Sequence, residues 1–281
     1  MNARGLFGLM RPVNCAMIGF AVIVGAFVSK PPSVSDYQLF LGFLTGFLIC
    51  AYSMAVNDVY DVEVDRVNRP ERPIPSGEVT ARQAAGFSYA LLALGLVSSV
   101  LSFLPLAVLI ALAYAFLSWL YNSRAKKTGL AGNLIVASSL AIPFIYGGAV
   151  SGGSIAGSLL LMMALTAFFS GVGREVVKAM ADVEGDAKRE VNSVARSRGL
   201  GFAASVGALF FVLAVLTSWV PLVTGLANQV YTYGVAVPDV VFLYLAVAIL
   251  RSHQPGSAYR DKRIALAGMT VGLLVFIGGA A

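Results

Sequence analysis

The sequence has few charged residues, two cysteines and a single histidine. Only 12% of its 281 residues are charged and 58% are hydrophobic, whereas soluble domains carry about 25% charged residues. The shortage extends along the whole chain, which excludes a soluble body held by one anchor. Both cysteines lie in apolar runs, so neither a disulfide framework nor a zinc site is indicated. The composition predicts a polytopic membrane protein.

Long apolar segments repeat along the chain and set its architecture. A helix needs about 20 apolar residues to cross a bilayer, and nine segments approach this length. We therefore predict an all-α membrane protein with nine transmembrane helices, forming one domain over residues 1–281. The predicted spans are 12–29, 37–60, 82–101, 104–121, 131–150, 154–178, 200–220, 233–250 and 263–281.

Basic residues fall in alternate loops between these segments. The loops on the other side hold one basic residue, Lys30. By the positive-inside rule, the amino terminus is cytoplasmic and the carboxyl terminus lies outside the cell membrane. This bias and contact with anionic lipid account for the net charge of +6 without a nucleic-acid partner.

Acidic residues are concentrated in two short clusters. Eleven of the fourteen Asp and Glu lie within 58–78 or 175–190, and the clusters read NDVYDVEVD and KAMADVEGDAKRE. Each cluster ends an apolar segment on the predicted cytoplasmic side. They are four helices apart, which suggests two similar, parallel halves facing each other. Charge beside a bilayer is costly and usually marks function.

Helical spacing gathers the acidic side chains of each cluster on one face. At about 100° per residue, the first face carries four oxygen-bearing side chains within roughly 100°, with Glu63 pointing away. The second face spans about 80°. Either cluster alone also fits a solvated helix end with ion pairs, but two favour a hard cation such as Mg²⁺. The faces comprise Asn57, Asp58, Asp61 and Asp65, and Glu175, Lys178, Asp182, Asp186 and Arg189.

Basic side chains follow closely on the same predicted side. Arg66, Arg69 and Arg72 come after the first cluster, and Lys126 and Lys127 lie in the loop after the fourth span. Carboxylates bind the metal, while the metal and Lys/Arg bind phosphate. Beside a lipid interior this combination predicts a lipid-tailed diphosphate. Its ionisation at the first carbon of the tail releases pyrophosphate.

These motifs resemble those of a known family. NDVYDVEVDRVNRPERPIPSG and DVEGD are similar to the two aspartate motifs of the UbiA superfamily of intramembrane prenyltransferases, and RPVNC, KKTGLAGNLIVA and PFIYGG extend the resemblance over nearly the whole chain. The resemblance implies nine helices around a central cavity, with the motifs on cytoplasmic loops. Within the superfamily, these segments are most similar to archaeal geranylgeranylglyceryl phosphate geranylgeranyltransferases, which make an ether-lipid precursor.

The resemblance also implies roles for individual residues. Mg²⁺ would be held by Asn57, Asp61, Asp65, Asp182 and Asp186, to which the helical-face argument adds Asp58. The diphosphate would be bound by Arg66, Arg72, Tyr121, Lys126, Lys127, Lys178 and Arg189. The acceptor would meet Arg11 and Asn14, and Arg69 is a further arginine for an acceptor phosphate. The expected catalytic set is Asp61, Asp65, Asp182, Asp186 and Lys126.

Two other functions fit parts of the sequence. An aromatic acceptor, as in quinone biosynthesis, would use the same diphosphate machinery. A transporter could also have two halves, but its charges should lie inside the helices rather than at their ends. The expected partners are an isoprenyl diphosphate, a lipid-like or aromatic acceptor and membrane lipids.

Overall fold

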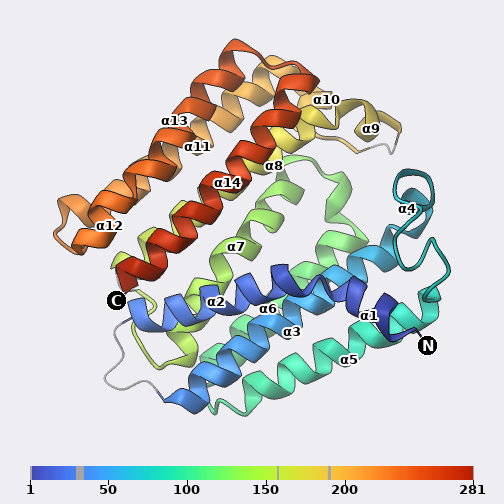
Figure 1. The fold of residues 1–281 in the computed structure, drawn as a ribbon, viewed down its shortest axis with the longest axis horizontal. Coiled ribbons are helices and arrows are strands. Elements are labelled where there is room, and N and C mark those ends of the chain that lie inside the picture. Colours follow the sequence, from blue (N-terminus) through green and yellow to red (C-terminus); the bar gives the residue numbers. More distant parts are fainter. Residues whose placement is uncertain (1, 30–34, 157, 189–190, 281) are drawn as a thin grey trace. The chain divides into compact units, whose positions relative to one another are not determined.

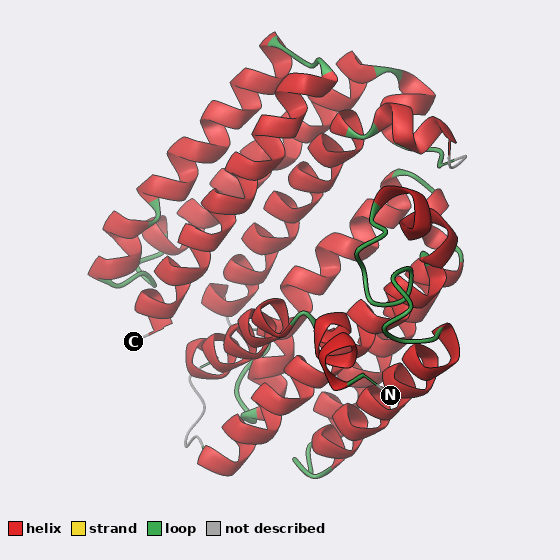
Figure 2. Cartoon of the chain, turned by 45° about the vertical axis from the view of Figure 1, so that its right-hand side comes forward, coloured by secondary structure: helices red, strands yellow, loops and turns green. Residues whose placement is uncertain are grey.

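The computed structural model describes residues 2–29, 35–156, 158–188 and 191–280, all as helices and connecting loops (Figure 2). Within these ranges there is no strand, which confirms the all-α prediction. In chain order the helices are α1 (Ala3–Met10), α2 (Pro12–Val28), α3 (Asp36–Tyr60), α4 (Val62–Asn68), α5 (Ala81–Val100), α6 (Pro105–Ser123), the 3₁₀ helix η1 (Ala125–Lys127), α7 (Leu130–Val150), α8 (Ser158–Ala181), α9 (Val183–Lys188), α10 (Val194–Arg198), α11 (Leu200–Val223), α12 (Gln229–Gly234), α13 (Ala236–Arg251) and α14 (Pro255–Ala280).

The helix lengths confirm a multi-pass membrane protein. Among the described residues, eight spans are long and apolar enough to cross a membrane, or nine if the bent pair α1 and α2 counts as one. That pair bends by 44° at Arg11, which has a left-handed backbone (φ 50°) and precedes Pro12 at the start of α2. Proline fits the first helical position because its missing N–H has no helical partner there.

The last span begins earlier than the sequence predicted. We expected it to start at residue 263, but α14 starts at Pro255 and includes the charged stretch Arg260 to Arg263. The prediction placed the helix start where the apolar run starts. Charged residues are excluded from hydrocarbon but not from a helix, so a membrane helix can extend beyond its apolar part.

The chain divides into two compact units. Unit 1 comprises residues 1–123 and 146–154. In it, α3 packs against α2, α5 and α6, and Figure 1 shows α3 running beside α2 and α5. The end of α7 belongs to this unit because it approaches α2 closely: a Cβ on Gly147 would overlap the carbonyl oxygen of Val22.

Unit 2 comprises residues 124–145 and 155–281. Here α8 packs against α11 and α14, and α13 packs against both α11 and α14. Its core contains Val176 and Met180 from α8, Phe211 from α11 and Leu245 from α13, all fully buried. Each unit therefore holds one acidic cluster at the end of a long, packed helix. The expectations of one domain and of pseudo-symmetric halves stay predictions.

Candidate functional site

The first acidic cluster lies where α3 passes into α4. Asp61 ends α3 and begins α4. Its N–H donates to the carbonyl of Asn57 (3.0 Å), and the N–H of Asp65 donates to the carbonyl of Asp61 (2.8 Å). Because these are helical i to i+4 bonds, the backbone keeps helical spacing through the junction. The structure thus agrees with the predicted helical continuation.

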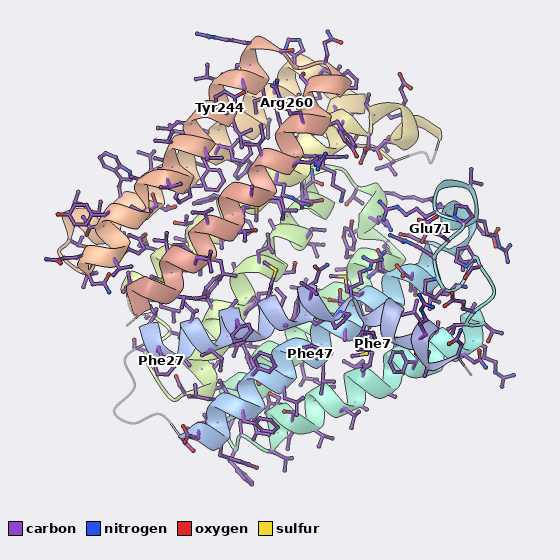
Figure 3. The ribbon with its side chains drawn as sticks, viewed as in Figure 1. Phe7, Phe27, Phe47, Glu71, Tyr244 and Arg260 are labelled. Carbon is purple, nitrogen blue, oxygen red and sulfur yellow. The ribbon has the colours of Figure 1, made fainter. Side chains whose placement is uncertain are left out.

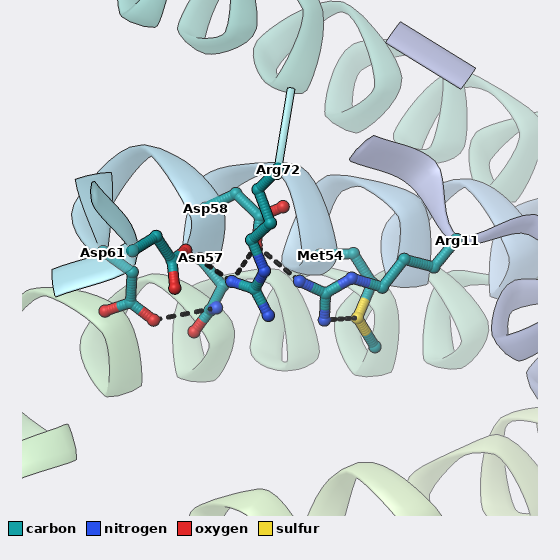
Figure 4. Close-up of polar contacts among 7 residues, drawn as sticks. Arg11, Met54, Asn57, Asp58, Asp61 and Arg72 are labelled. Carbon is teal, nitrogen blue, oxygen red and sulfur yellow. Dashed lines mark hydrogen bonds and ion pairs between the residues drawn. The ribbon is translucent and has the colours of Figure 1, made fainter. Parts of the chain in front are cut away.

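The side chains on this face contact one another, as Figure 4 shows. The amide nitrogen of Asn57 donates to Asp61 Oδ2 at 3.1 Å. Arg72 binds Asp58 (3.1 Å) and Asp65 (2.5 Å) through the same nitrogen, Nη1. Both of these aspartates are buried. The loop after α4 therefore folds back over this face, and Arg72 joins Asp58 of α3 to Asp65 of α4.

Arg11 brings a second guanidinium to this group. Its Nη2 lies 2.5 Å from Asp58 Oδ1, and its Nη1 lies 3.5 Å from the sulfur of Met54. Asp58 is 4% exposed, and a buried carboxylate is costly unless it is paired. Two arginines and two buried carboxylates thus form one ion-pair group in unit 1. The resemblance implied that Arg11 meets the acceptor, and no pattern in the sequence predicted its pairing with Asp58.

Other residues predicted for this region are exposed. Arg66 pairs with Glu63 at 2.9 Å, and both side chains are largely exposed. This agrees with the prediction that Glu63 lies off the acidic face. Arg69 and Asn14 are also exposed. Of the three residues predicted for the acceptor, Arg11 is the one that the ion-pair group holds in place.

The second cluster repeats the backbone arrangement of the first. Asp182 lies between α8 and α9, as Asp61 lies between α3 and α4. The N–H of Asp182 donates to the carbonyl of Lys178 (3.0 Å), and the N–H of Asp186 donates to that of Asp182 (2.8 Å). In both clusters, an aspartate joins a long helix to a short one, with another aspartate four residues later.

Ion pairs surround the second cluster in unit 2. Glu175 is buried and pairs with Arg174 (2.8 Å) and Lys178 (3.0 Å). Asp182 pairs with Lys262 of α14 at 3.2 Å. Lys262 is not among the site residues predicted from the sequence. It lies 80 residues from Asp182, and no local pattern connects the two.

The predicted lysine pair lies on a loop that contacts the chain just beyond this cluster. Lys126 and Lys127 form the end of η1. The N–H of Asn192 donates to the carbonyl of Lys127 at 3.0 Å. Gly129 allows this contact, because its φ is 64° and a Cβ at this position would overlap the carbonyl oxygen of Asn192. Arg189 lies outside the described residues, and Tyr121 is partly buried on α6 of unit 1.

The donor chemistry suits a hard cation shared with a ligand. Among the described residues, no group of three or more His, Cys, Asp or Glu side chains forms a complete metal cage. Mg²⁺ typically takes one or two carboxylates and completes its shell with waters and substrate phosphates. The carboxylate of Asp61 and the amide oxygen of Asn57 fit that requirement, and the two side chains lie together because the Asn57 amide nitrogen donates to Asp61 Oδ2 at 3.1 Å.

Curated relatives match almost the whole chain. The protein is 37% identical over 281 residues to a digeranylgeranylglyceryl phosphate synthase of Archaeoglobus fulgidus, covering 99% of this chain and 95% of the relative. It is 36% identical over 278 residues to the protein of the same name from Methanopyrus kandleri, covering 98% of each.

Solved structures share the fold. One, of a digeranylgeranylglyceryl phosphate synthase in membranes, has a TM-score of 0.84 and 31% identity and covers 99% of this chain and 98% of its own. A UbiA homologue from Archaeoglobus fulgidus bound to GPP and Mg²⁺ has a TM-score of 0.71 at 18% identity, covering 97% of this chain and 99% of its own. The model of the UbiA prenyltransferase family matches residues 18–274. With residues 18–274 of its 281 matched, the chain belongs to the UbiA prenyltransferase family.

Proposed function

We propose that this prenyltransferase transfers a geranylgeranyl group from geranylgeranyl diphosphate to geranylgeranylglyceryl phosphate, in a Mg²⁺-dependent reaction. The observation that carries the proposal is the near full-length similarity, at 37% identity, to a relative named digeranylgeranylglyceryl phosphate synthase. In the reaction, the bond between the first prenyl carbon and the diphosphate oxygen breaks, and pyrophosphate leaves with the electron pair. The acceptor hydroxyl forms the new ether bond and loses its proton.

The two acidic clusters supply the metal ligands in this proposal. Bound Mg²⁺ would neutralise charge on the leaving pyrophosphate. The residues that would hold it are Asn57, Asp61, Asp65, Asp182 and Asp186. The support is their oxygen chemistry and the shared arrangement of an aspartate at each helix junction, followed by another four residues later. Asp58 was also predicted as a ligand and stays a prediction; in the structure it pairs with Arg11 and Arg72, and Asp65 also pairs with Arg72.

Basic residues around the clusters would bind the diphosphate. Arg72 already contacts the first cluster, and the loop of Lys126 and Lys127 contacts the chain beyond the second. We assign the same role to Arg66, Lys178, Tyr121 and Arg189. Lys and Arg suit this task because charge-assisted hydrogen bonds to phosphate are strong. The acceptor phosphate is assigned to Arg11, Asn14 and Arg69.

The proposed site opens to the cytoplasm. The support is the loop charge pattern, which places the amino terminus inside and the carboxyl terminus outside. Each acidic cluster ends a helix, and the loop that follows it is rich in Lys and Arg. A cytoplasmic opening would give water-soluble Mg²⁺ access to a site whose prenyl substrates remain in the membrane.

The test is a paired assay with purified protein in detergent or vesicles. Geranylgeranyl diphosphate and Mg²⁺ are supplied with either geranylgeranylglyceryl phosphate or 4-hydroxybenzoate, and pyrophosphate and the prenylated product are both measured. We expect the digeranylgeranyl ether product with the first acceptor and none with the second. Efficient prenylation of hydroxybenzoate, with the glyceryl phosphate unused, would transfer the proposal to an aromatic acceptor.

A further inference from the structure

Lys262 holds a position beside the second acidic cluster that the proposed function has not used. It lies in the amino-terminal part of α14, two residues after Arg260, which Figure 3 labels. Its ammonium group is 3.2 Å from Asp182 Oδ1, and 19% of its side chain is exposed. The α14 helix packs against α8, which ends one residue before Asp182. The packing of two membrane helices therefore brings the lysine to this carboxylate.

The side chain of Lys262 is directed by a second contact. Its nitrogen lies 4.5 Å from the centroid of the Tyr259 ring, three residues earlier on α14. A ring face attracts an ammonium group electrostatically. Lysine otherwise loses considerable conformational entropy when it is held in one place. Contact with the ring and low exposure distinguish Lys262 from an ordinary surface lysine. The partner of Lys262, Asp182, has a 46% exposed side chain, and an ion pair at such a site contributes little to stability.

The position of Lys262 conflicts with a metal ion on Asp182 unless an anion is also bound. Mg²⁺ binds carboxylate oxygens at about 2.0–2.1 Å, so an ion on Asp182 would lie close to the ammonium group and repel it. A diphosphate oxygen bound to the same ion would accept a hydrogen bond from that group. Lysine suits such an exchange because its charge sits on a long, flexible stem with three rotatable donors.

We propose that Lys262 is a further diphosphate-binding residue, which neutralises Asp182 when the site is empty and transfers to the diphosphate when Mg²⁺ and substrate bind. This rests on the proposed function, in which Asp182 is a metal ligand. A basic residue from α14 then contacts the substrate alongside those of the second acidic cluster and of the loop after α6. Lys262 binds the diphosphate of the substrate and releases it as pyrophosphate after the prenyl group has been transferred. It transfers no proton.

The first test measures geranylgeranyl diphosphate binding directly, without acceptor, in the presence of Mg²⁺. Lys262→Met removes the charge and retains most of the side-chain length. We expect its affinity for geranylgeranyl diphosphate to fall about tenfold or more, as for a lost charge-assisted hydrogen bond, while the affinity for Mg²⁺ alone does not fall. Lys262→Arg, which keeps a positive charge, should recover most of the loss. The matched control is Arg263→Met, the same loss of charge at the next, exposed residue of α14, with an expected change below twofold.

A change below threefold in Lys262→Met, or equal losses in Lys262→Met and Lys262→Arg, would overturn the proposal and leave Lys262 as a tether between α14 and α8. If the wild-type protein itself binds no geranylgeranyl diphosphate with Mg²⁺, the proposed function fails instead. The two failures are therefore distinct.

A second measurement needs no variant and does not depend on how well Lys262→Met folds. Wild-type protein is acetylated with an amine-reactive reagent, and modification of Lys262 is measured by peptide mass spectrometry. We expect Mg²⁺ alone to increase modification, because the ammonium group leaves Asp182, and Mg²⁺ with pyrophosphate to reduce it below the metal-free level. Modification that is the same under all three conditions would overturn the exchange.

Discussion

Arg11 lies 2.5 Å from Asp58, although 47 residues separate them in the sequence. The pair joins the bend between α1 and α2 to the carboxyl-terminal part of α3. Arg11 adopts a left-handed backbone (φ 50°), which is uncommon for a residue other than glycine and has a conformational cost. The ion pair with a buried carboxylate is an interaction that offsets this cost. Arg11 therefore has a structural role in addition to any contact with the acceptor.

We predict that Arg11→Ala lowers stability by about 1–3 kcal/mol, because it removes a charge-assisted hydrogen bond from a buried carboxylate. The measurement is the midpoint of thermal unfolding in detergent. In an Asp58→Asn background, the same change should cost less, since no buried charge is left behind. Arg69→Ala is the control, because Arg69 is exposed. If both arginine variants unfold at the same temperature, the ion pair contributes nothing measurable.

The two junction aspartates should be essential for turnover. We predict that Asp61→Ala and Asp182→Ala each reduce kcat by at least about a hundredfold, because each removes a proposed metal ligand and its stabilisation of the leaving group. Steady-state pyrophosphate release measures the effect, and thermal unfolding checks that the protein remains folded.

The matched control is Glu63→Ala, which removes an acid from the same stretch of chain. Glu63 is exposed and paired with Arg66, and exposed pairs contribute about 0–1 kcal/mol. Its turnover should stay within about threefold of wild type. A loss as large as that of Asp61→Ala would contradict the assignment of the acidic face.

Much of the fold follows from the sequence because apolar runs and helical spacing act locally. The predicted span 37–60 and the observed α3 (Asp36–Tyr60) differ by one residue. The acidic face was predictable because helical hydrogen bonds continue through Asp61. In contrast, the pairs Arg11–Asp58 and Lys262–Asp182 join residues distant in sequence, and tertiary packing alone brings them together. The start of α14 was predicted wrongly for a different reason. Charged residues show where the apolar part of a membrane helix ends, but the helix itself can extend further.

Activity should require a divalent cation. The proposed ligands are carboxylate and amide oxygens, which favour Mg²⁺ or Mn²⁺ over softer metals. We predict that stripping the metal and adding excess chelator reduces prenyl transfer to background, and that Mg²⁺ restores it. The measurement is product formation from radiolabelled geranylgeranyl diphosphate. Full turnover in chelator would contradict a metal-dependent release of pyrophosphate.

The membrane topology can be tested with single cysteines. Cys15 and Cys50 are free and buried, so a background lacking both is required. Ser76 and Ser197 are exposed, and cysteines there should react with a membrane-impermeant maleimide only from the cytoplasmic side.

Cysteines at Ser154 and Thr224, which are also exposed, should react from outside. Asn228, in the same loop as Thr224, is unsuitable for this test, because its side chain caps α12 and donates to the carbonyl of Gly278, so replacing it would disturb the fold. Labelling of the Ser76 and Ser154 positions from the same side would contradict the nine-span topology.

Asp239 should stabilise unit 2 without taking part in the reaction. It is a buried acid of α13, and both of its oxygens accept from the hydroxyl of Ser218 (2.9 and 3.0 Å) while Oδ2 also accepts from the indole N–H of Trp219 (2.9 Å). These contacts join α13 to the end of α11. Removing the carboxylate leaves the indole N–H of Trp219 without this acceptor and leaves the Ser218 hydroxyl with the carbonyl of Val215 (2.7 Å) as an acceptor, and a lost charge-assisted hydrogen bond is costly.

We therefore predict that Asp239→Ala lowers the free energy of unfolding by about 2 kcal/mol or more, measured by thermal unfolding in detergent. Asp239→Asn keeps one acceptor oxygen and should lose less. The control is Asp36→Ala, because Asp36 is exposed in the first turn of α3, where a charge near a helix end contributes about 0.3–1 kcal/mol. At a temperature where Asp239→Ala is folded, its KM for geranylgeranyl diphosphate should match that of wild type. An Asp239→Ala protein as stable as Asp36→Ala would show that the contacts between α11 and α13 hold without the carboxylate.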